Sequence, residues 1–414
     1  MVKVQVPSEL IHGGVEQGYG PVADAFRRNF AERGEIGAAV AVYRDGQKVV
    51  DLWGGYRDGV ERAPWERDTL VNVFSTTKGI ASMAIAVAHS WALLDYDAPV
   101  ATYWPEFATN GKQHVTVRQL LSHQAGLPAI DRPLDLDMLA DLDLLANALA
   151  EQAPAWDPGT RHGYHAVTLG WYEGELLRRV DPGRRSLGRF FADEIATPLG
   201  IEFYIGVPDE LEMSRFATIH GYHRAEMLLH LHELPPRFVL AMLNPKSLTA
   251  RTVGNPKALG VPANYNRRDV RRLEIPAGNG NGHARSIAAA YGDLATGGET
   301  LGLTPQTLAA LTEPAHPPTK GLHDQVLHIE TAYSLGYLKP FSRSRFGTSA
   351  GKAFGTGGGG SFGFADLDAG IGFGYVMNRF GFHMFDDPRE VALRHALYHD
   401  VLDEAPQHPD ADQT

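Results

Sequence analysis

The chain has 414 residues, of which 43% are hydrophobic and 21% are charged, a balance typical of a globular protein. Its formal net charge of −11 argues against a nucleic acid or an acidic membrane as partner, because both would require a basic surface. Cysteine is absent, which excludes disulfides, zinc–thiolate sites and cysteine nucleophiles.

The amino terminus lacks the long apolar stretch of a secretory signal. The most apolar segment, residues 80–94, is interrupted by polar residues and is shorter than a membrane span requires. These features predict a buried helix at residues 80–94 and a cytoplasmic protein without a membrane partner.

In the first third of the chain, helical spacing at residues 22–33 places Val22, Phe26 and Phe30 on one face. Strand-like runs follow at residues 37–43 and 48–53, and Asp45-Gly46 between them is typical of a tight hairpin turn. A helix is expected from Ser75. The middle of the chain, residues 95–285, has mostly helical patterns, which are clearest over residues 134–151.

Residues 243–283 are rich in Pro, Gly, Asn and Arg and show little periodicity, which predicts a long irregular loop that walls a functional site. Beyond it, a helix is predicted at residues 284–295. Strands are predicted at 333–338, 361–366 and 370–377, and a final helix at 388–402. The polar tail, residues 404–414, is predicted to be frayed.

The order of these elements predicts the architecture. Strands come first, helices follow, and strands return near the carboxyl end. This order predicts an α/β (α+β) fold with one antiparallel sheet, formed by both chain ends and flanked by helices, and an inserted, mostly helical lobe. We expect residues 1–94 and 285–414 to form the sheet domain and residues 95–284 to form the helical insertion domain.

The motif Ser75-Thr76-Thr77-Lys78 precedes an apolar helical run. Residues three apart at a helix start lie on the same face, and the positive end of the helix dipole stabilises negative charge that develops on Ser75. A serine hydroxyl becomes a good nucleophile when a base removes its proton. A lysine can serve as this base if burial keeps it neutral, which we expect for Lys78.

The S-x-x-K spacing is common by chance, and a second copy occurs at Ser349 and Lys352, in a stretch without helical pattern. We interpret that copy as incidental. For Ser75 and Lys78, the four residues alone favour a serine that caps a helix beside a solvated lysine.

Further segments follow the Ser75 helix in order. They are LLSHQAGLP at residues 120–128, WDPGT at 156–160, GYHAVTLGW at 163–171, and strand-like runs at 355–366 and 370–378. Together with the Ser75 motif, they resemble the superfamily of serine β-lactamases, penicillin-binding proteins and family VIII carboxylesterases. The resemblance covers most of the chain, and the segment at 163–171 is especially similar to the esterase branch. It implies the β-lactamase-like fold.

The resemblance also implies roles for individual residues. Ser75 matches the nucleophile that becomes acylated, and Lys78 matches the general base. Tyr164 matches the tyrosine whose phenolic oxygen the family places within reach of the nucleophile. Such a tyrosine can pass the proton from Ser75 to the leaving group.

The third family motif is matched by Thr356, Gly357 and Gly358, where β-lactamases have Lys-Thr-Gly. In the family, the backbone N–H just after this triplet and the N–H of the nucleophile form the oxyanion hole. The resemblance therefore implies Ser75 and Gly359 as the two donors, with an uncertainty of one residue within the glycine run. Such preorganised donors are a large catalytic factor.

Two departures from the β-lactamase pattern bear on the substrate. Thr356 replaces the lysine that would hold a β-lactam carboxylate, and Ala166 replaces the asparagine of the second motif. Both favour an uncharged small-molecule ester, so we predict a serine carboxylesterase that uses an acyl-enzyme. A β-lactamase or D-amino-acid peptidase, an acyltransferase, and a non-catalytic acyl-binding protein remain as alternatives.

Other motifs are interpreted as structural. Ser361 lies in a G-x-S-x-G sequence, but a strand pattern follows it where a nucleophile elbow requires a helix. The glycines at residues 355–360 lack the strand–helix unit of a dinucleotide site. No metal or organic cofactor is expected, and we interpret the following histidines as packing or surface residues: His123, His220, His223, His230 and His232.

Overall fold

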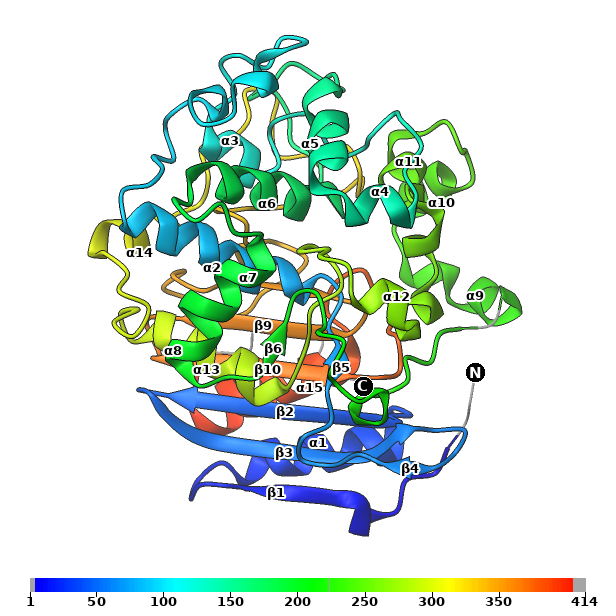
Figure 1. The fold of residues 1–414 in the computed structure, drawn as a ribbon. Helices are drawn as coiled ribbons and strands as arrows, with labels where there is room; N and C mark the ends of the chain where they lie inside the picture. Colours follow the sequence, from blue (N-terminus) through cyan, green and yellow to red (C-terminus); the bar gives the residue numbers. More distant parts are fainter. Residues whose placement is uncertain (1–3, 223, 405–414) are drawn as a thin grey trace.

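The computed structural model describes residues 4–222 and 224–404. Its main sheet has seven strands, which come from both ends of the chain (Figure 1). Six of them follow the antiparallel order β1-β3-β2-β10-β9-β8, and β4 pairs with β3. This confirms the predicted sheet. The strands are β1 (Ile11–Val15), β2 (Gly37–Arg44), β3 (Gln47–Asp58), β4 (Ala63–Pro64), β8 (Phe354–Gly358), β9 (Ser361–Asp366) and β10 (Ile371–Met377).

The hairpin between β2 and β3 forms where the sequence predicts it. Arg44 pairs with Gln47, so Asp45 and Gly46 alone make the turn. Their φ angles are 50° and 77°, and a two-residue turn with two positive φ angles matches the twist of the strands it joins. Asp and Gly tolerate this conformation, which is why the dipeptide predicts the turn.

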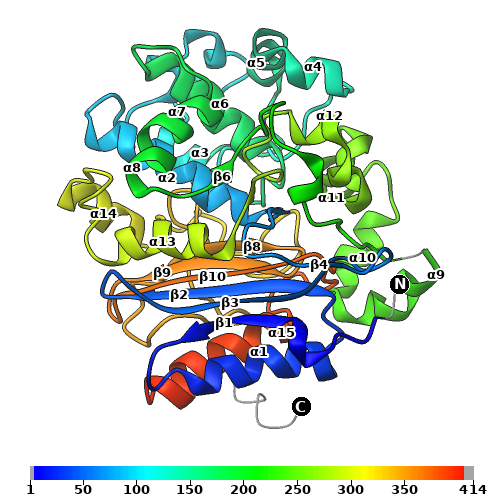
Figure 2. The same ribbon diagram turned by 60° about the horizontal axis from the view of Figure 1, so that its bottom comes forward.

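Helices cover both faces of the sheet (Figure 2). On one face, α1 (Gly20–Glu32) packs against α15 (Pro388–His395), which continues as a π-helical segment, Ala396–Val401. On the other face lie α13 (Ala284–Ala295) and α2 (Thr76–Ser90), which contacts β8 and β9. Helix α2 is buried over residues 76–88, so it forms the centre of the molecule between the sheet and the helical lobe.

The helical lobe contains α3 (Val117–Leu121), α4 (Leu136–Ala140), α5 (Leu142–Glu151), α6 (Thr168–Val180), α7 (Leu187–Phe191) and α8 (Thr197–Leu199). Helices α3 to α6 lie above α2 in Figure 1, whereas α7 and α8 lie lower in this view. The helical pattern at residues 134–151 forms two helices, because Asp141 is extended and its carboxylate caps α5. A small second sheet joins β5 (Val71–Asn72), β7 (Asn281–Gly282) and β6 (Phe203–Tyr204).

Two predictions of secondary structure are wrong. Residues 243–283 contain α11 (Leu248–Gly254) and α12 (Arg268–Arg271) with short 3₁₀ turns. Residues 333–338 form only an isolated bridge between Tyr333 and Leu338. The remaining helices are α9 (Arg224–His230), α10 (Pro236–Met242) and α14 (Pro305–Thr312).

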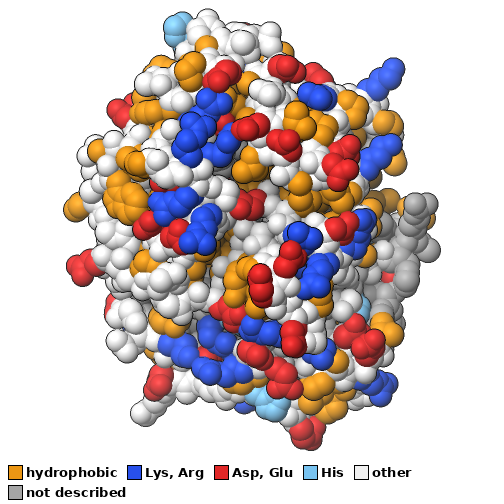
Figure 3. Space-filling view, in the orientation of Figure 1, with side chains coloured by type: hydrophobic (Ala, Val, Ile, Leu, Met, Phe, Trp, Pro, Cys, Tyr) orange, Lys and Arg blue, Asp and Glu red, His pale blue; other side chains and the backbone are white. Residues whose placement is uncertain are grey.

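Acidic and basic side chains are interspersed over the face in Figure 3, without a broad surface of one sign. In the part of the chain that the structure describes, no helix combines the length and the apolar character needed to cross a bilayer. Residues 405–414, which hold nearly all of the predicted frayed tail, lie outside the described residues.

Candidate active site

Ser75 lies at the start of α2 behind a strained residue. Phe74 has a φ of 46°, a left-handed conformation that costs a non-glycine residue about 1–3 kcal/mol. Its N–H donates to Asn72 Oδ1 at 3.2 Å, and its ring packs edge-on against Tyr265 and Phe380. These contacts hold the turn that leaves β5 and presents Ser75. Ser75 is half-buried, and its hydroxyl does not cap the helix.

The side chain of Lys78 is 1% exposed and points at Ser75. Its Nζ lies 3.0 Å from Ser75 Oγ, 2.6 Å from the carbonyl oxygen of Ala166 and 2.9 Å from that of Ala277. The alternative of a capping serine beside a solvated lysine is therefore wrong. Ala277 lies in the segment at residues 243–283, so that segment does contribute to the site.

This geometry suits both protonation states of Lys78. A neutral amine has two N–H groups for the two carbonyl oxygens and one lone pair, which then faces the hydroxyl of Ser75. An ammonium group has three N–H groups, and each meets one of the three acceptors. Lys78 can therefore take and return a proton without a change of position.

Tyr164 lies beside the amine. Lys78 Nζ is 4.8 Å from the centre of the Tyr164 ring. The hydroxyl of Tyr164 makes no hydrogen bond to any residue in 4–222 or 224–404. The face of the Tyr164 ring thus contacts the proposed base.

Asp324 holds Tyr164 in place, and the sequence analysis missed it. It is fully buried, and its carboxylate accepts the N–H of Tyr164 at 3.0 and 3.2 Å and the hydroxyl of Tyr333 at 2.8 Å. It also accepts the N–H groups of Val326 and Leu327, both at 2.8 Å. Because these partners are separated in sequence by up to 160 residues, no local pattern indicates this role.

Two histidines hold the segment around Tyr164 in place through hydrogen bonds. His123 Nδ1 accepts the N–H of His165 at 3.0 Å, and His165 Nδ1 donates to the carbonyl of Gly163 at 2.7 Å. Burial lowers the pKa of His165 to about 3 and that of His123 well below its ordinary value, so both are neutral. Their bonds agree with the structural role predicted for His123.

The hydroxyl of Thr356 is used by the fold. It accepts the N–H of Gly79 at 3.0 Å and donates to the carbonyl of Thr76 at 3.1 Å, and the side chain is 4% exposed. Thr356 thereby fastens α2 to β8. Gly357 follows it on β8 and pairs with Phe362.

The glycine run passes close to the nucleophile. A Cβ atom added to Gly358 would lie 2.8 Å from Ser75 Cβ, so only glycine fits there without a shift. Gly355 exchanges both backbone hydrogen bonds with Leu338, on the side away from β9. Because strand groups alternate, the N–H group of Gly357 on β8 points toward that same open edge, whereas Gly359 lies in the turn beyond the end of β8.

The alternative nucleophile and the second S-x-x-K motif lie elsewhere. The hydroxyl of Ser361 is buried and lies 2.7 Å from the carbonyl oxygen of Val73, in strand β9, which agrees with its predicted structural role. Ser349 and Lys352 are exposed, and Lys352 pairs with Asp368 at 3.2 Å.

Two of the histidines near residue 220 have protein partners. His220 Nε2 accepts the N–H of Gly59 at 3.0 Å, and His230 pairs with Glu233 at 2.7 Å. His223 lies outside the described residues. Among the described residues, donor atoms spaced for a metal ion occur at His395, His399 and Asp400, near the carboxyl end and not at Ser75.

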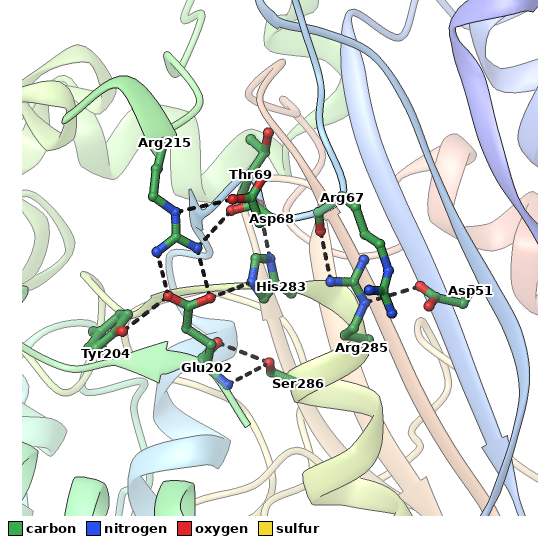
Figure 4. Close-up of polar contacts among 10 residues, drawn as sticks. All are labelled: Asp51, Arg67, Asp68, Thr69, Glu202, Tyr204, Arg215, His283, Arg285 and Ser286. Carbon is green, nitrogen blue, oxygen red and sulfur yellow. Dashed lines mark hydrogen bonds and ion pairs between the residues drawn. The ribbon is translucent and has the colours of Figure 1, made fainter. Parts of the chain in front are cut away.

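A polar cluster joins the chain segments that flank the small second sheet (Figure 4). His283 Nδ1 lies 3.0 Å from the carbonyl oxygen of Thr69, and its Nε2 lies 3.0 Å from Glu202. Both partners are acceptors, so the imidazolium form satisfies both. Glu202 also accepts two hydrogen bonds of 2.8 Å from Arg215. The hydrogen bonds from His283 and Arg215 outweigh the effect of burial, so the pKa of Glu202 is lowered. The cluster ties β6 and β7 to the strand that leads to Ser75.

Comparisons with known proteins agree with this geometry. A family model described as Beta-lactamase matches residues 22–398. The Esterase/beta-lactamase LipL of Mycobacterium tuberculosis is 33% identical over 376 residues, which cover 89% of this chain and 83% of that protein.

Solved structures show the same similarity. The crystal structure of a family VIII carboxylesterase has 37% identity and a TM-score of 0.82, and the match covers 94% of this chain and 99% of that one. A penicillin-binding protein homologue from Caulobacter crescentus has 36% identity and a TM-score of 0.79 with the same coverage. These matches confirm the family that the sequence motifs indicated. The chain belongs to the beta-lactamase family of serine hydrolases.

Proposed function

We propose that the protein hydrolyses carboxylic esters through an acyl-enzyme on Ser75, with Lys78 and Tyr164 as general base and acid. The observation that carries this proposal is the distance of 3.0 Å between the buried amine of Lys78 and the hydroxyl of Ser75. A nucleophile within hydrogen-bond reach of its base, with the base oriented by further groups, is the arrangement that covalent catalysis requires.

In the acylation step, Ser75 Oγ attacks the ester carbonyl carbon while its proton passes to the lone pair of Lys78 Nζ. The carbonyl oxygen becomes an oxyanion. As the carbon–oxygen bond to the alcohol breaks, the proton passes to the alcohol, and the hydroxyl of Tyr164 relays it. Water then attacks the acyl-enzyme with the same groups as base and acid, and the carboxylic acid is released.

For the oxyanion we propose the N–H groups of Ser75 and Gly359. One feature supports this choice: Gly358 approaches Ser75 closely, which brings the glycine run against the nucleophile at the open edge of β8. Gly357 also offers an N–H on this edge and is the other candidate within the run. Two fixed donors at this position would stabilise the developing charge by several kcal/mol, of the order of 3 per donor.

An uncharged ester is the substrate class that the site favours. Where β-lactamases place a lysine in the third motif, the hydroxyl of Thr356 is occupied by α2. Ala166, at the position of the asparagine in the second motif, has only a methyl side chain. Neither side chain is available for the carboxylate or the amide of a β-lactam.

The test of the proposed nucleophile is labelling with a fluorophosphonate, which reacts with activated serines, followed by mass spectrometry of peptides. We expect the added mass on the peptide that contains Ser75. A label on Ser361 or Ser349 would overturn the assignment. A single burst of product without steady turnover would instead indicate a non-catalytic acyl-binding protein.

β-Lactam hydrolysis is the second candidate, because the name of the Mycobacterium tuberculosis relative includes that activity. We expect kcat/KM for a p-nitrophenyl ester to exceed that for a chromogenic cephalosporin by about 100-fold or more, since the loss of one charged contact costs about 2–3 kcal/mol. Equal values for the two substrates would contradict this preference. Parallel assays with added alcohol would reveal acyl transfer in place of hydrolysis.

A further inference from the structure

A buried carboxyl group lies behind the proposed base. Glu173, on α6, is fully buried, and its Oε1 accepts the hydroxyl of Ser82 at 2.7 Å. Ser82 follows Lys78 by four residues on α2, so the two side chains share one face of that helix. Helices α2 and α6 pack directly together, which places the carboxyl group of Glu173 one helical turn from Lys78.

Glu173 is tightly packed, yet one of its two carboxyl oxygens has no hydrogen-bond partner among the described residues. Gly336, with a φ of 83°, covers it so tightly that an added Cβ would lie 2.0 Å from Ser82 Oγ and 3.1 Å from Glu173 Oε1. The other oxygen, Oε2, has no hydrogen-bond partner among residues 4–222 and 224–404. A buried carboxyl group without full pairing costs stability, so a structural tie between two helices does not by itself explain it.

Few titratable groups face this carboxyl group. From α2 it faces Lys78, and from the segments at Tyr96 and Tyr337 it faces two buried phenols. Burial raises the pKa of Glu173 to about 8, against smaller lowering effects of the Ser82 hydrogen bond and the charge of Lys78. The group can therefore change charge near neutral pH.

The contacts of Lys78 can accommodate its ammonium form. Three acceptors surround Nζ, and the face of the Tyr164 ring lies 4.8 Å away. The nearby rings of His123 and His165 are neutral and do not repel this charge.

We propose that Glu173 is a positioning residue that acts through Lys78: its buried carboxylate holds a proton on the amine and so sets the lower pH limit of ester hydrolysis. The sign follows from Coulomb's law, because a negative charge stabilises the ammonium form and opposes loss of the proton that catalysis requires. This inference rests on the proposed function, since it assumes that neutral Lys78 is the base.

The test is the pH dependence of kcat/KM for an uncharged p-nitrophenyl ester in the Glu173→Gln variant. Glutamine keeps the shape and the acceptor for Ser82 but cannot become negative. We expect the midpoint of the acidic limb to move to lower pH by about one unit, with KM nearly unchanged, because a neighbouring charge typically shifts a titration by this order. Activity below the midpoint should rise accordingly.

Glu175→Gln is the matched control. Glu175 lies two residues away on α6 and pairs with Arg178 at 2.8 Å and Arg179 at 2.6 Å, away from Lys78. Its loss should reduce thermal stability and leave the pH midpoint in place. If Glu173→Gln folds poorly, Glu173→Met removes the same charge with an apolar side chain and should give the same downward shift.

The outcomes separate the inference from the proposed function. If wild-type protein turns over the ester and is labelled at Ser75, but the midpoint in both folded Glu173 variants is unchanged or higher, Glu173 has no such role. If the wild-type protein shows no ester turnover, or the label falls on another serine, the proposed function itself fails. A shift of equal size in Glu175→Gln would also overturn the inference, because it would mark a general effect of charge.

Discussion

Replacement of Ser75 by alanine is expected to abolish ester hydrolysis, with kcat lower by about 10⁴-fold or more. The nucleophile forms the acyl-enzyme. Among the described residues, Ser75 supplies the one hydroxyl that forms a hydrogen bond with the buried amine of Lys78. The fold should remain intact, because the hydroxyl of Ser75 does not cap α2 and the residue is only half-buried. Turnover of a p-nitrophenyl ester and thermal unfolding, measured on the same sample, check both parts.

Ser361→Ala provides the control for a serine that belongs to the framework. Its hydroxyl lies near the carbonyl oxygens of Val73 and Gly358 and near the hydroxyl of Thr76. Loss of these bonds should lower stability by about 1–2 kcal/mol while the fluorophosphonate still labels Ser75. Substantial steady-state activity in purified Ser75→Ala protein would contradict the mechanism, whatever its stability.

The parts of the fold that could be predicted have a local cause. The Asp45-Gly46 turn needs two residues that tolerate positive φ, and the helix at Ala284–Ala295 and strand β9 appear at their predicted bounds. The pattern of residues 355–366 does not reveal their structure, because the run resembles one core strand but contains parts of two strands, β8 and β9. Gly359 and Gly360, with φ angles of 65° and 103°, make the turn between them. A stretch of glycines has no side-chain alternation that could reveal such a turn.

The candidate site shows the same limit. Ser75, Lys78 and Tyr164 could be found because each lies in a motif with a characteristic spacing. Asp324 and Glu173 could not, since a carboxyl group in an irregular segment or on a helix looks like a solvated side chain until its burial is known. What gives these two residues their chemistry is tertiary packing, which brings segments 91 and 160 residues apart into contact.

The largest expected loss of stability comes from a buried charge network behind the sheet. Arg389 is 4% exposed and binds Glu35 at 3.0 Å and Asp387 through two bonds of 2.8 Å. The hydroxyl of Tyr375, on β10, also donates to Glu35. Burial raises the pKa of Glu35, whereas for Asp387 the charge and hydrogen bonds of Arg389 outweigh burial and lower the pKa.

Arg389→Met should lower the free energy of unfolding at pH 7 by about 3–5 kcal/mol, because two carboxylates then stay buried without their counter-charge. Chemical denaturation measures this loss. Arg27→Met is the control: Arg27 pairs with Asp24 at 3.0 Å, but both side chains are more than half exposed, so its loss should be small.

The loss in Arg389→Met should also depend on pH with a definite sign. In the wild-type protein the lowered pKa of Asp387 contributes stability at pH above its unfolded value near 3.9, and this contribution fades as pH falls. Without Arg389, Glu35 and Asp387 must bind protons to remain buried, so the variant gains relative stability in acid. The difference in the free energy of unfolding between the wild-type protein and Arg389→Met should therefore decrease from pH 7 to pH 5. A difference that stays constant, or one as small as that of Arg27→Met, would mean that these carboxyl groups are already neutral in the wild-type protein.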